Sequence, residues 1–92
     1  MKLTVGQSVL VPCSVAPGAF SGESLVTIEF GSQRVSGFVG NEFVTGEAIC
    51  GMVLDVAGDE VTFRMPGSFF TLATGTATVP SDWASRNLRP AA

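Results

Sequence analysis

The sequence predicts a small all-β domain, a compact barrel of about five to seven short antiparallel strands with a single helical turn near residues 80–85. Three observations lead to this prediction. Runs rich in β-branched and aromatic residues recur along the chain, glycine and proline separate them, and no window longer than one turn has helical periodicity. Ninety-two residues suffice for one domain. We therefore expect residues 1–92 to form a single unit with a frayed tail at residues 90–92.

The first predicted strand covers residues 8–15. Its valines and leucine favour an extended backbone. Pro12 has no N–H to donate to a neighbouring strand, so we expect an edge strand or a bulge at this position. Residues 16–23 follow as a loop punctuated by glycine and proline, and Phe20 is an exposed aromatic residue on it.

Residues 24–39 are predicted to form a hairpin. Gly31 and Ser32 fit a two-residue type II′ turn, which requires glycine at its first central position. This turn places Glu29 opposite Arg34, and a cross-strand pair of opposite charges contributes about 0.2–1 kcal/mol. The turn chemistry and the charge pairing therefore indicate the same register.

A second hairpin is predicted for residues 49–65, with a polar four-residue loop that contains a glycine. Pairing Val56 with Val61 across this loop places Leu54 opposite Phe63.

Two further strands, at residues 69–73 and 76–79, lead to the helical turn expected over residues 80–85. Short strands that are separated by turns in this way are typical of a small barrel or sandwich.

The segment Thr78-Val-Pro-Ser-Asp-Trp-Ala84 resembles the last-strand signature of SH3 domains, where a Pro-Ser-Asn-Tyr sequence marks a short 3₁₀ turn. Pro80, Ser81 and Trp83 occupy the matching positions, and Asp82 stands for the usual asparagine. The resemblance implies an SH3-like barrel. The other SH3 motifs are missing, including the paired tryptophans, so the resemblance implies no proline-peptide groove.

A second resemblance covers approximately the first half of the chain, from Val11-Pro-Cys-Ser-Val to Ser36-Gly-Phe-Val39. This part is similar to small uncharacterised bacterial proteins, including those encoded by the mobile gene cassettes of integrons. The similarity implies no particular activity.

Charge argues against nucleic acid as a partner. The net charge is −3, and the five bases are scattered, whereas nucleic-acid binding depends on Lys and Arg that neutralise phosphates. No apolar stretch approaches the roughly 20 residues that span a bilayer, and no apolar leader follows Met1 and Lys2. We therefore expect no membrane contact and a cytoplasmic location.

The absence of histidine and tyrosine narrows the possible chemistry. It excludes a Ser-His-Asp triad, a Cys-His pair and a histidine-ligated zinc site. Cys13 and Cys50 lack C-x-x-C spacing and are expected to be buried thiols, with a disulfide between them as the alternative. We assign no catalytic residue, no metal and no cofactor.

The leading functional hypothesis is a non-enzymatic binding or self-associating module that contacts a protein partner. Charged residues make up only 14% of the chain, and a neutral surface favours association. The candidate contact residues are Phe20, Phe69, Phe70 and Trp83. Successive strand residues face opposite sides, so Phe69 and Phe70 cannot both face the core without a bulge or a covering partner. Trp83 either plugs the barrel end or faces a ligand.

Two alternatives remain open. The chain could be an enzyme or a small-ligand protein whose pocket forms at a subunit interface, where acids such as Glu42 and Asp82 meet. It could also bind nucleic acid as an OB-like or Tudor-like barrel, which would require at least three of its bases on one face.

Overall fold

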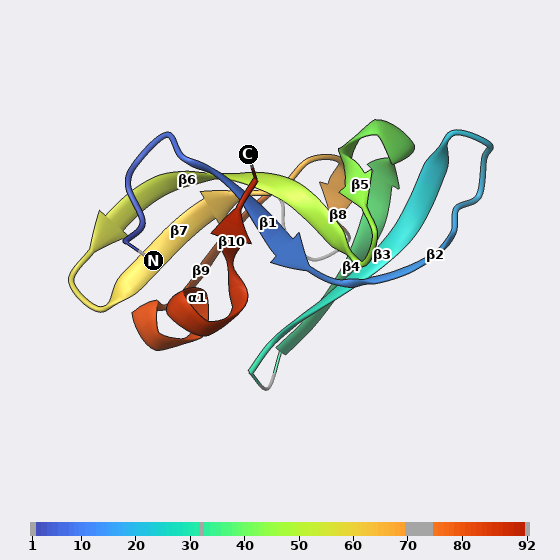
Figure 1. Cartoon of the computed structure of the whole chain (residues 1–92). Coiled ribbons are helices and arrows are strands. Elements are labelled where there is room, and N and C mark those ends of the chain that lie inside the picture. The colour runs from blue at the N-terminus through green and yellow to red at the C-terminus, as the bar shows by residue number, and fades with distance from the viewer. Residues whose placement is uncertain (1, 32, 70–74, 92) are drawn as a thin grey trace.

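In this computed structural model, which describes residues 2–31, 33–69 and 75–91, the chain forms two antiparallel sheets (Figure 1). Sheet A has the order β10-β1-β6-β7-β9, and β5 also pairs with β6. Its strands are β1 (Ser8–Pro12), β5 (Val44–Thr45), β6 (Ala48–Ala57), β7 (Glu60–Arg64), β9 (Thr76–Pro80) and β10 (Arg89–Pro90). Sheet B has the order β2-β3-β4-β8, with β2 (Ser14–Pro17), β3 (Glu23–Phe30), β4 (Gln33–Gly40) and β8 (Ser68–Phe69).

The all-β prediction is confirmed. Seven of the ten strands in the described part have four or more residues, and three have only two. The same part of the chain contains two short helical segments, η1 (Asn41–Phe43) and α1 (Ser81–Asn87).

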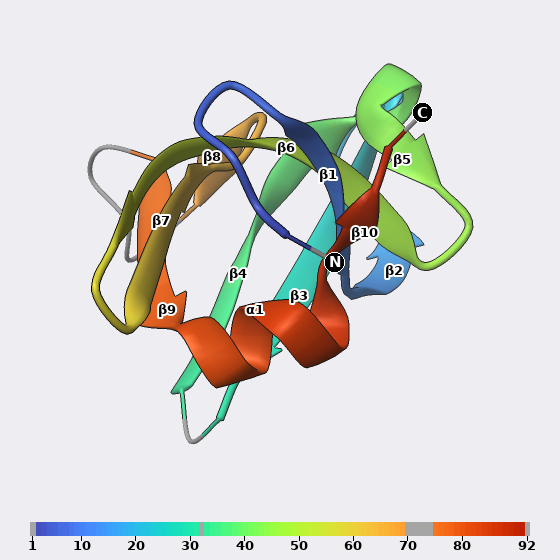
Figure 2. The same cartoon turned by 60° about the vertical axis from the view of Figure 1, so that its left-hand side comes forward.

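The two sheets enclose one apolar core. Both contribute fully buried side chains, among them Val9, Ile49, Val53 and Phe63 from sheet A and Ile28 from sheet B. No polar or charged side chain of the described part is buried. Helix α1 lies across the end of the molecule below β9 and β10 (Figure 2). The fold is therefore held mainly by burial of aliphatic and aromatic groups.

The first strand is divided rather than continuous. Strand β1 ends at Pro12, and β2 begins at Ser14 in the other sheet. The expectation of an edge strand or a bulge at Pro12 is correct only for the end of the strand. Strand β10 covers Val9 and Leu10 of β1, whereas Pro12 pairs in the described part only with Ala48 of β6. The missing N–H of Pro12 marks the end of β1, and the N–H of Cys13 donates to the carbonyl of Glu47 (2.9 Å).

The hairpin of β3 and β4 has the predicted register. Glu29 pairs with Arg34, and the Nη2 atom of Arg34 lies 2.9 Å from Oε1 of Glu29. Gly31 has the positive φ (59°) that the turn requires. The turn type also depends on Ser32, which lies outside the described residues.

The predicted register of the β6–β7 hairpin is correct in one half of the hairpin and wrong in the other. Val56 pairs with Val61 as predicted, but a bulge shifts the register between Val53 and Asp55. Val53 therefore faces Phe63, in the place predicted for Leu54. The turn is also tighter than predicted, because Ala57 already pairs with Glu60.

The bulge reconciles two different alternations along β6. Ile49, Gly51 and Val53 face the core opposite the buried valines of β1. Val56 pairs with the buried Val61 and therefore lies on the same, inner side of the sheet. In a regular strand, Val53 and Val56 would face opposite sides because they are three residues apart. One extra residue in β6 satisfies both.

The predicted turn at residues 80–85 extends to the seven-residue helix α1. Side chains satisfy two of its carbonyls: Nδ2 of Asn87 donates to Trp83 O (2.8 Å), and Nε of Arg86 donates to Asp82 O (3.2 Å). The tail expected to fray from residue 90 is attached to β1 through Ala91, whose N–H donates to the carbonyl of Ser8 (3.1 Å).

Candidate functional site

The loop between β2 and β3 holds an exposed aromatic side chain, since Phe20 is 76% exposed. Two glycines shape the loop. A Cβ at Gly18 would lie 2.7 Å from Cγ and from the carbonyl oxygen of Glu23, and Gly22 has a φ of 87°. The chain can therefore turn tightly while Glu23 folds back over Gly18.

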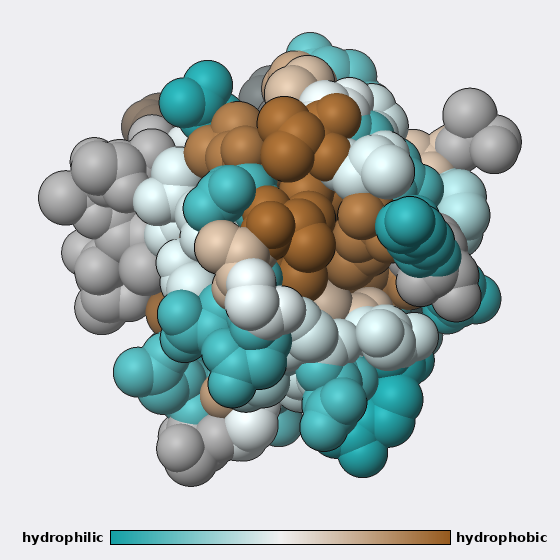
Figure 3. Space-filling view, turned by 90° about the vertical axis from the view of Figure 1, so that its left-hand side faces the viewer, coloured by the Kyte–Doolittle hydropathy of each residue, from teal (hydrophilic) through white to brown (hydrophobic). Residues whose placement is uncertain are grey.

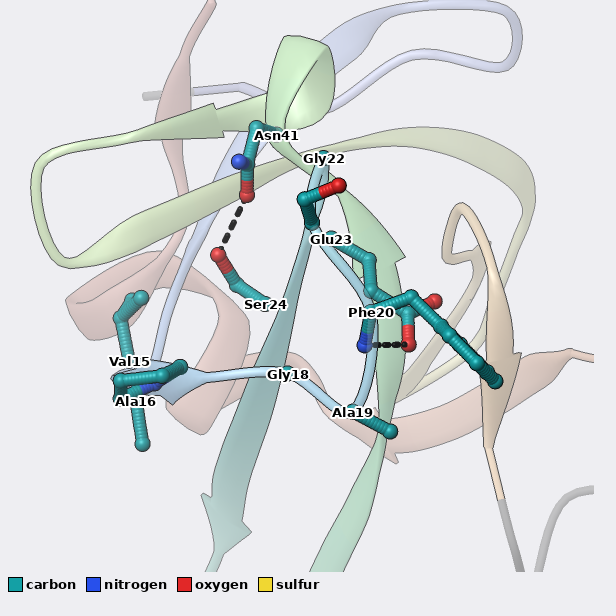
Figure 4. A pocket seen from close by; sticks show the side chains of 11 residues that line it. Val15, Ala16, Gly18, Ala19, Phe20, Gly22, Glu23, Ser24 and Asn41 are labelled. Carbon is teal, nitrogen blue, oxygen red and sulfur yellow. Dashed lines mark hydrogen bonds between the residues drawn. The ribbon is translucent and has the colours of Figure 1, made fainter.

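Hydrogen bonds hold this loop at both ends (Figure 4). Glu23 accepts from Gly18 N–H at its carbonyl oxygen and from Phe20 N–H at Oε1, each at 3.3 Å. At the other end, Asn41 N–H donates to Gly22 O (3.0 Å), and the Ser24 hydroxyl donates to Asn41 Oδ1 (2.5 Å). The phenyl ring points away from Ser24 and Asn41.

A hollow of about 530 Å³ lies beside Phe20. Residues 15–24 and Asn41 line it, and Glu23 carries the only charge among them. A second carboxylate lies nearby, because Gly40 pairs with Glu23 and a Cβ at Gly40 would overlap the carboxylate of Glu42. The hollow therefore combines an aromatic ring with negative charge.

Strand β2 forms one wall of this hollow, and all four of its residues are exposed. Its only described neighbour is β3. The bond from Gly18 N–H to Glu23 O sets the alternation of the ladder, so the polar backbone groups of Val15 and Pro17 point outward. Since Pro17 has no N–H and the strand is short, this edge offers few hydrogen bonds to another strand.

Trp83 lies on α1 and packs against the core. Its ring contacts Phe30 edge-on, with centroids 5.3 Å apart, and Phe30 contacts Phe63 in the same manner at 5.9 Å. The outer side of Trp83 lines a shallow depression with Cys13, Glu29 and other residues. The loop between β2 and β3, which carries Phe20, lies at the other end of the molecule from α1 (Figure 1), so the structure does not bring these two candidates together.

The other two candidates are less fully described. Phe69 belongs to β8, and its backbone pairs with Gly37 of β4. Phe70 lies outside the described residues. Their predicted role as contact residues stays a prediction.

The two cysteines are free thiols. Cys50 pairs with Leu10, whereas Cys13 lies opposite Glu47, which directly precedes β6 and is three residues before Cys50. This offset corresponds to about 10 Å along a strand, beyond the roughly 7 Å between Cα atoms that a disulfide tolerates. Burial, assisted by the nearby charge of Glu47, raises the pKa of Cys13 from 9.0 to about 11.

An apolar groove on the outer face of sheet A was not expected from the sequence. It has a volume of about 340 Å³, and Phe43 and Met52, which line it, are each nearly half exposed. The signal in the sequence was the alternation along β6, which places Cys50 and Met52 on the face opposite Ile49 and Val53.

Another apolar region lies at the end of sheet A that carries the β6–β7 turn. Figure 3 shows apolar side chains gathered on this side of the molecule. Leu3, Val56 and Val61 line a small hollow there, and Val5 is 65% exposed.

The acids proposed for an interface pocket, Glu42 and Asp82, belong to η1 and α1, which are separate parts of the fold. In residues 2–31, 33–69 and 75–91, no group of three or more Cys, Asp or Glu side chains could hold a metal ion. Neither helical segment in this part is long and apolar enough to cross a membrane.

Comparisons with protein families, curated proteins and solved structures found no match to this chain.

Proposed function

We propose that this chain is a non-enzymatic binding module that contacts a protein partner through the β2–β3 loop. Phe20 is the anchoring side chain, and the adjacent hollow accepts a basic side chain of the partner. The observation that carries this proposal is a phenylalanine left 76% exposed on a loop held by hydrogen bonds at both ends.

An exposed aromatic ring on a loop held by hydrogen bonds favours binding for two reasons. The fold gains little from Phe20, because most of its apolar surface stays in water. A partner that covers the ring gains this burial, and an already ordered loop loses little conformational entropy on binding. Aromatic anchors of this kind dominate many protein interfaces.

The preference for a basic partner follows from the charges. Glu23 is the only charged residue lining the hollow, and Glu42 lies close to it. A Lys or Arg side chain would gain attraction from these carboxylates and from the face of the Phe20 ring.

A random heptapeptide library displayed on phage and panned against the wild-type protein tests this proposal. We expect enriched peptides to contain Lys or Arg, and Phe20→Ala to weaken their binding by about 30-fold or more, the effect of losing a hot-spot residue. Glu23→Gln should weaken basic peptides selectively. Phe43→Ala, which removes another exposed phenylalanine, is the matched control and should leave binding unchanged. Enriched peptides that bind Phe20→Ala as tightly as wild type would refute the proposal.

Self-association is a second candidate, favoured by the apolar region at the β6–β7 end (Figure 3). A second copy would cover Val5 and Val56, which are 65% and 40% exposed. Sedimentation at increasing concentration should then reveal an oligomer that Val5→Glu dissociates and Val15→Glu, on another face, does not. A wild-type monomer at all concentrations would exclude this candidate.

The remaining predictions concern family and location. The SH3-like resemblance of residues 78–84 stays a prediction: β9 ends at Pro80 and α1 begins at Ser81 within this segment, and α1 is an α-helix rather than the 3₁₀ turn of the signature. A cytoplasmic location is supported by the two free thiols. The resemblance to integron-cassette proteins stays a prediction.

A further inference from the structure

Strand β6 has an opening along one of its edges. On that edge, β5 pairs with Ala48 and Ile49, and β7 begins its pairing at Met52. Between these two neighbours, Cys50 and Gly51 pair with β1 on the other edge but have no strand partner on this edge among the described residues. The opening between β5 and β7 spans three residue steps, or about 10 Å.

The backbone of Cys50 points into this opening. Val53 donates its N–H to Gln7 O (2.9 Å) and accepts from Gly6 N–H (2.8 Å), so its polar groups face the β1 side. Backbone groups alternate in direction along a strand. Those of Gly51 therefore face β1 as well, and the N–H and carbonyl of Cys50 face the opening.

The apolar groove lies over this opening. Phe43, the last residue of η1, lines the groove together with Met65 and Pro66, which directly follow β7. Met52 stands in a row between Ser8 and Arg64, its partners on the two adjacent strands. Among the described residues that line the groove, Arg64 is the only charged one. The groove thus offers apolar walls, one cationic group, and one backbone N–H donor beside a backbone carbonyl.

We propose that this groove binds a small aliphatic carboxylate. The aliphatic chain lies against Phe43 and Met52, whose flexible thioether adapts to its shape. The carboxylate accepts hydrogen bonds from the guanidinium of Arg64 and from the N–H of Cys50, and bonds between charged partners are the stronger kind.

The shape of the opening favours this ligand over an extended peptide. A peptide pairing along β6 would run into the ends of β5 and β7, because only Cys50 and Gly51 separate them. A ligand with a single polar head can enter end-on. An amine is disfavoured, because it would meet Arg64 with like charge.

Octanoate is the probe, and alkylation of Cys50 is the readout, since this thiol lines the groove. Cys13→Ser leaves Cys50 as the only thiol. We expect saturating octanoate to slow Cys50 alkylation by at least tenfold, with a Kd on the order of 1 mM for a ligand of this size. Arg64→Gln should raise the Kd by about tenfold or more, and Arg64→Lys should restore part of the affinity. Arg34→Gln, which removes an exposed arginine on β4, is the matched control and should change neither the Kd for octanoate nor the protection of Cys50.

Three results would overturn the proposal. One is an unchanged Cys50 rate up to 10 mM octanoate. Another is equal protection by octanol or octylamine, which would leave an apolar groove without carboxylate recognition. The third is stronger protection by a capped leucine tripeptide, which would identify a main-chain ligand. Circular dichroism of each variant separates lost binding from lost folding.

Discussion

Replacing Phe63 and Phe20 by alanine, one at a time, should separate the phenylalanine that holds the core from the one available to a partner. Phe63 is fully buried and packs edge-on against Phe30. Phe63→Ala should lower the free energy of unfolding by about 3–5 kcal/mol. Phe20 buries only about a quarter of its surface. Full burial of phenylalanine is worth about 1.5–3 kcal/mol, so Phe20→Ala should cost about 0.4–0.8 kcal/mol.

Urea unfolding followed by the fluorescence of Trp83, the only tryptophan, measures both changes. A domain of this size is stable by roughly 5–14 kcal/mol, so Phe63→Ala should remove a large part of that stability. With a denaturant slope of about 1–3 kcal/mol/M, its midpoint should fall by at least about 1 M. A loss above about 1.5 kcal/mol in Phe20→Ala would show that its ring packs into the fold. A loss below about 1 kcal/mol in Phe63→Ala would contradict its place in the core.

Three further predictions concern a thiol, an ion pair and a glycine. The pKa of Cys13 is raised from 9.0 to about 11. In the Cys50→Ser variant, the rate of Cys13 alkylation should therefore rise with a midpoint near pH 11 in the native protein and near pH 9 in urea. A native midpoint at or below pH 9 would contradict this. Because the unfolded thiol ionises first, stability should fall as pH rises from about 9 towards 11, and Cys13→Ser should reduce this fall in thermal melts. Arg34→Ala should cost at most about 1 kcal/mol, and less in 1 M salt, because its pair with Glu29 is solvent-exposed; a larger loss in urea unfolding that persists in salt would indicate a different role. Gly51→Ala should cost about 1–3 kcal/mol, because its Cβ would lie 2.8 Å from a carbonyl oxygen of β7; an unchanged melting temperature would contradict this close approach.

The β3–β4 hairpin was predictable because its information is local. Gly31 specifies a tight turn, and a tight turn sets every pair that follows, including Glu29 with Arg34. The exposed position of Phe20 was predictable for a similar reason, since glycine and proline on both sides keep this segment out of a sheet.

The register of β6 was not predictable in the same way. Residues 49–56 contain two overlapping alternations, one through Ile49 and Val53 and the other through Leu54 and Val56. Either alternation by itself would give the strand a plausible buried face. Pairing with β1 on one edge and β7 on the other makes both alternations necessary in different halves, and the bulge follows.

The sequence by itself determined the all-β class, the positions of most strands and turns, and the catalytic chemistries excluded by the absence of histidine and tyrosine. These follow from residue type and from contacts between near neighbours. The tertiary structure decided that β1 and β2 join different sheets and that Trp83 packs on Phe30. It also decided that, among the described residues, one edge of β6 has no strand partner at Cys50, beside Phe43 and Arg64. Such features join segments far apart in the chain, and only burial of the shared core selects among the possible pairings.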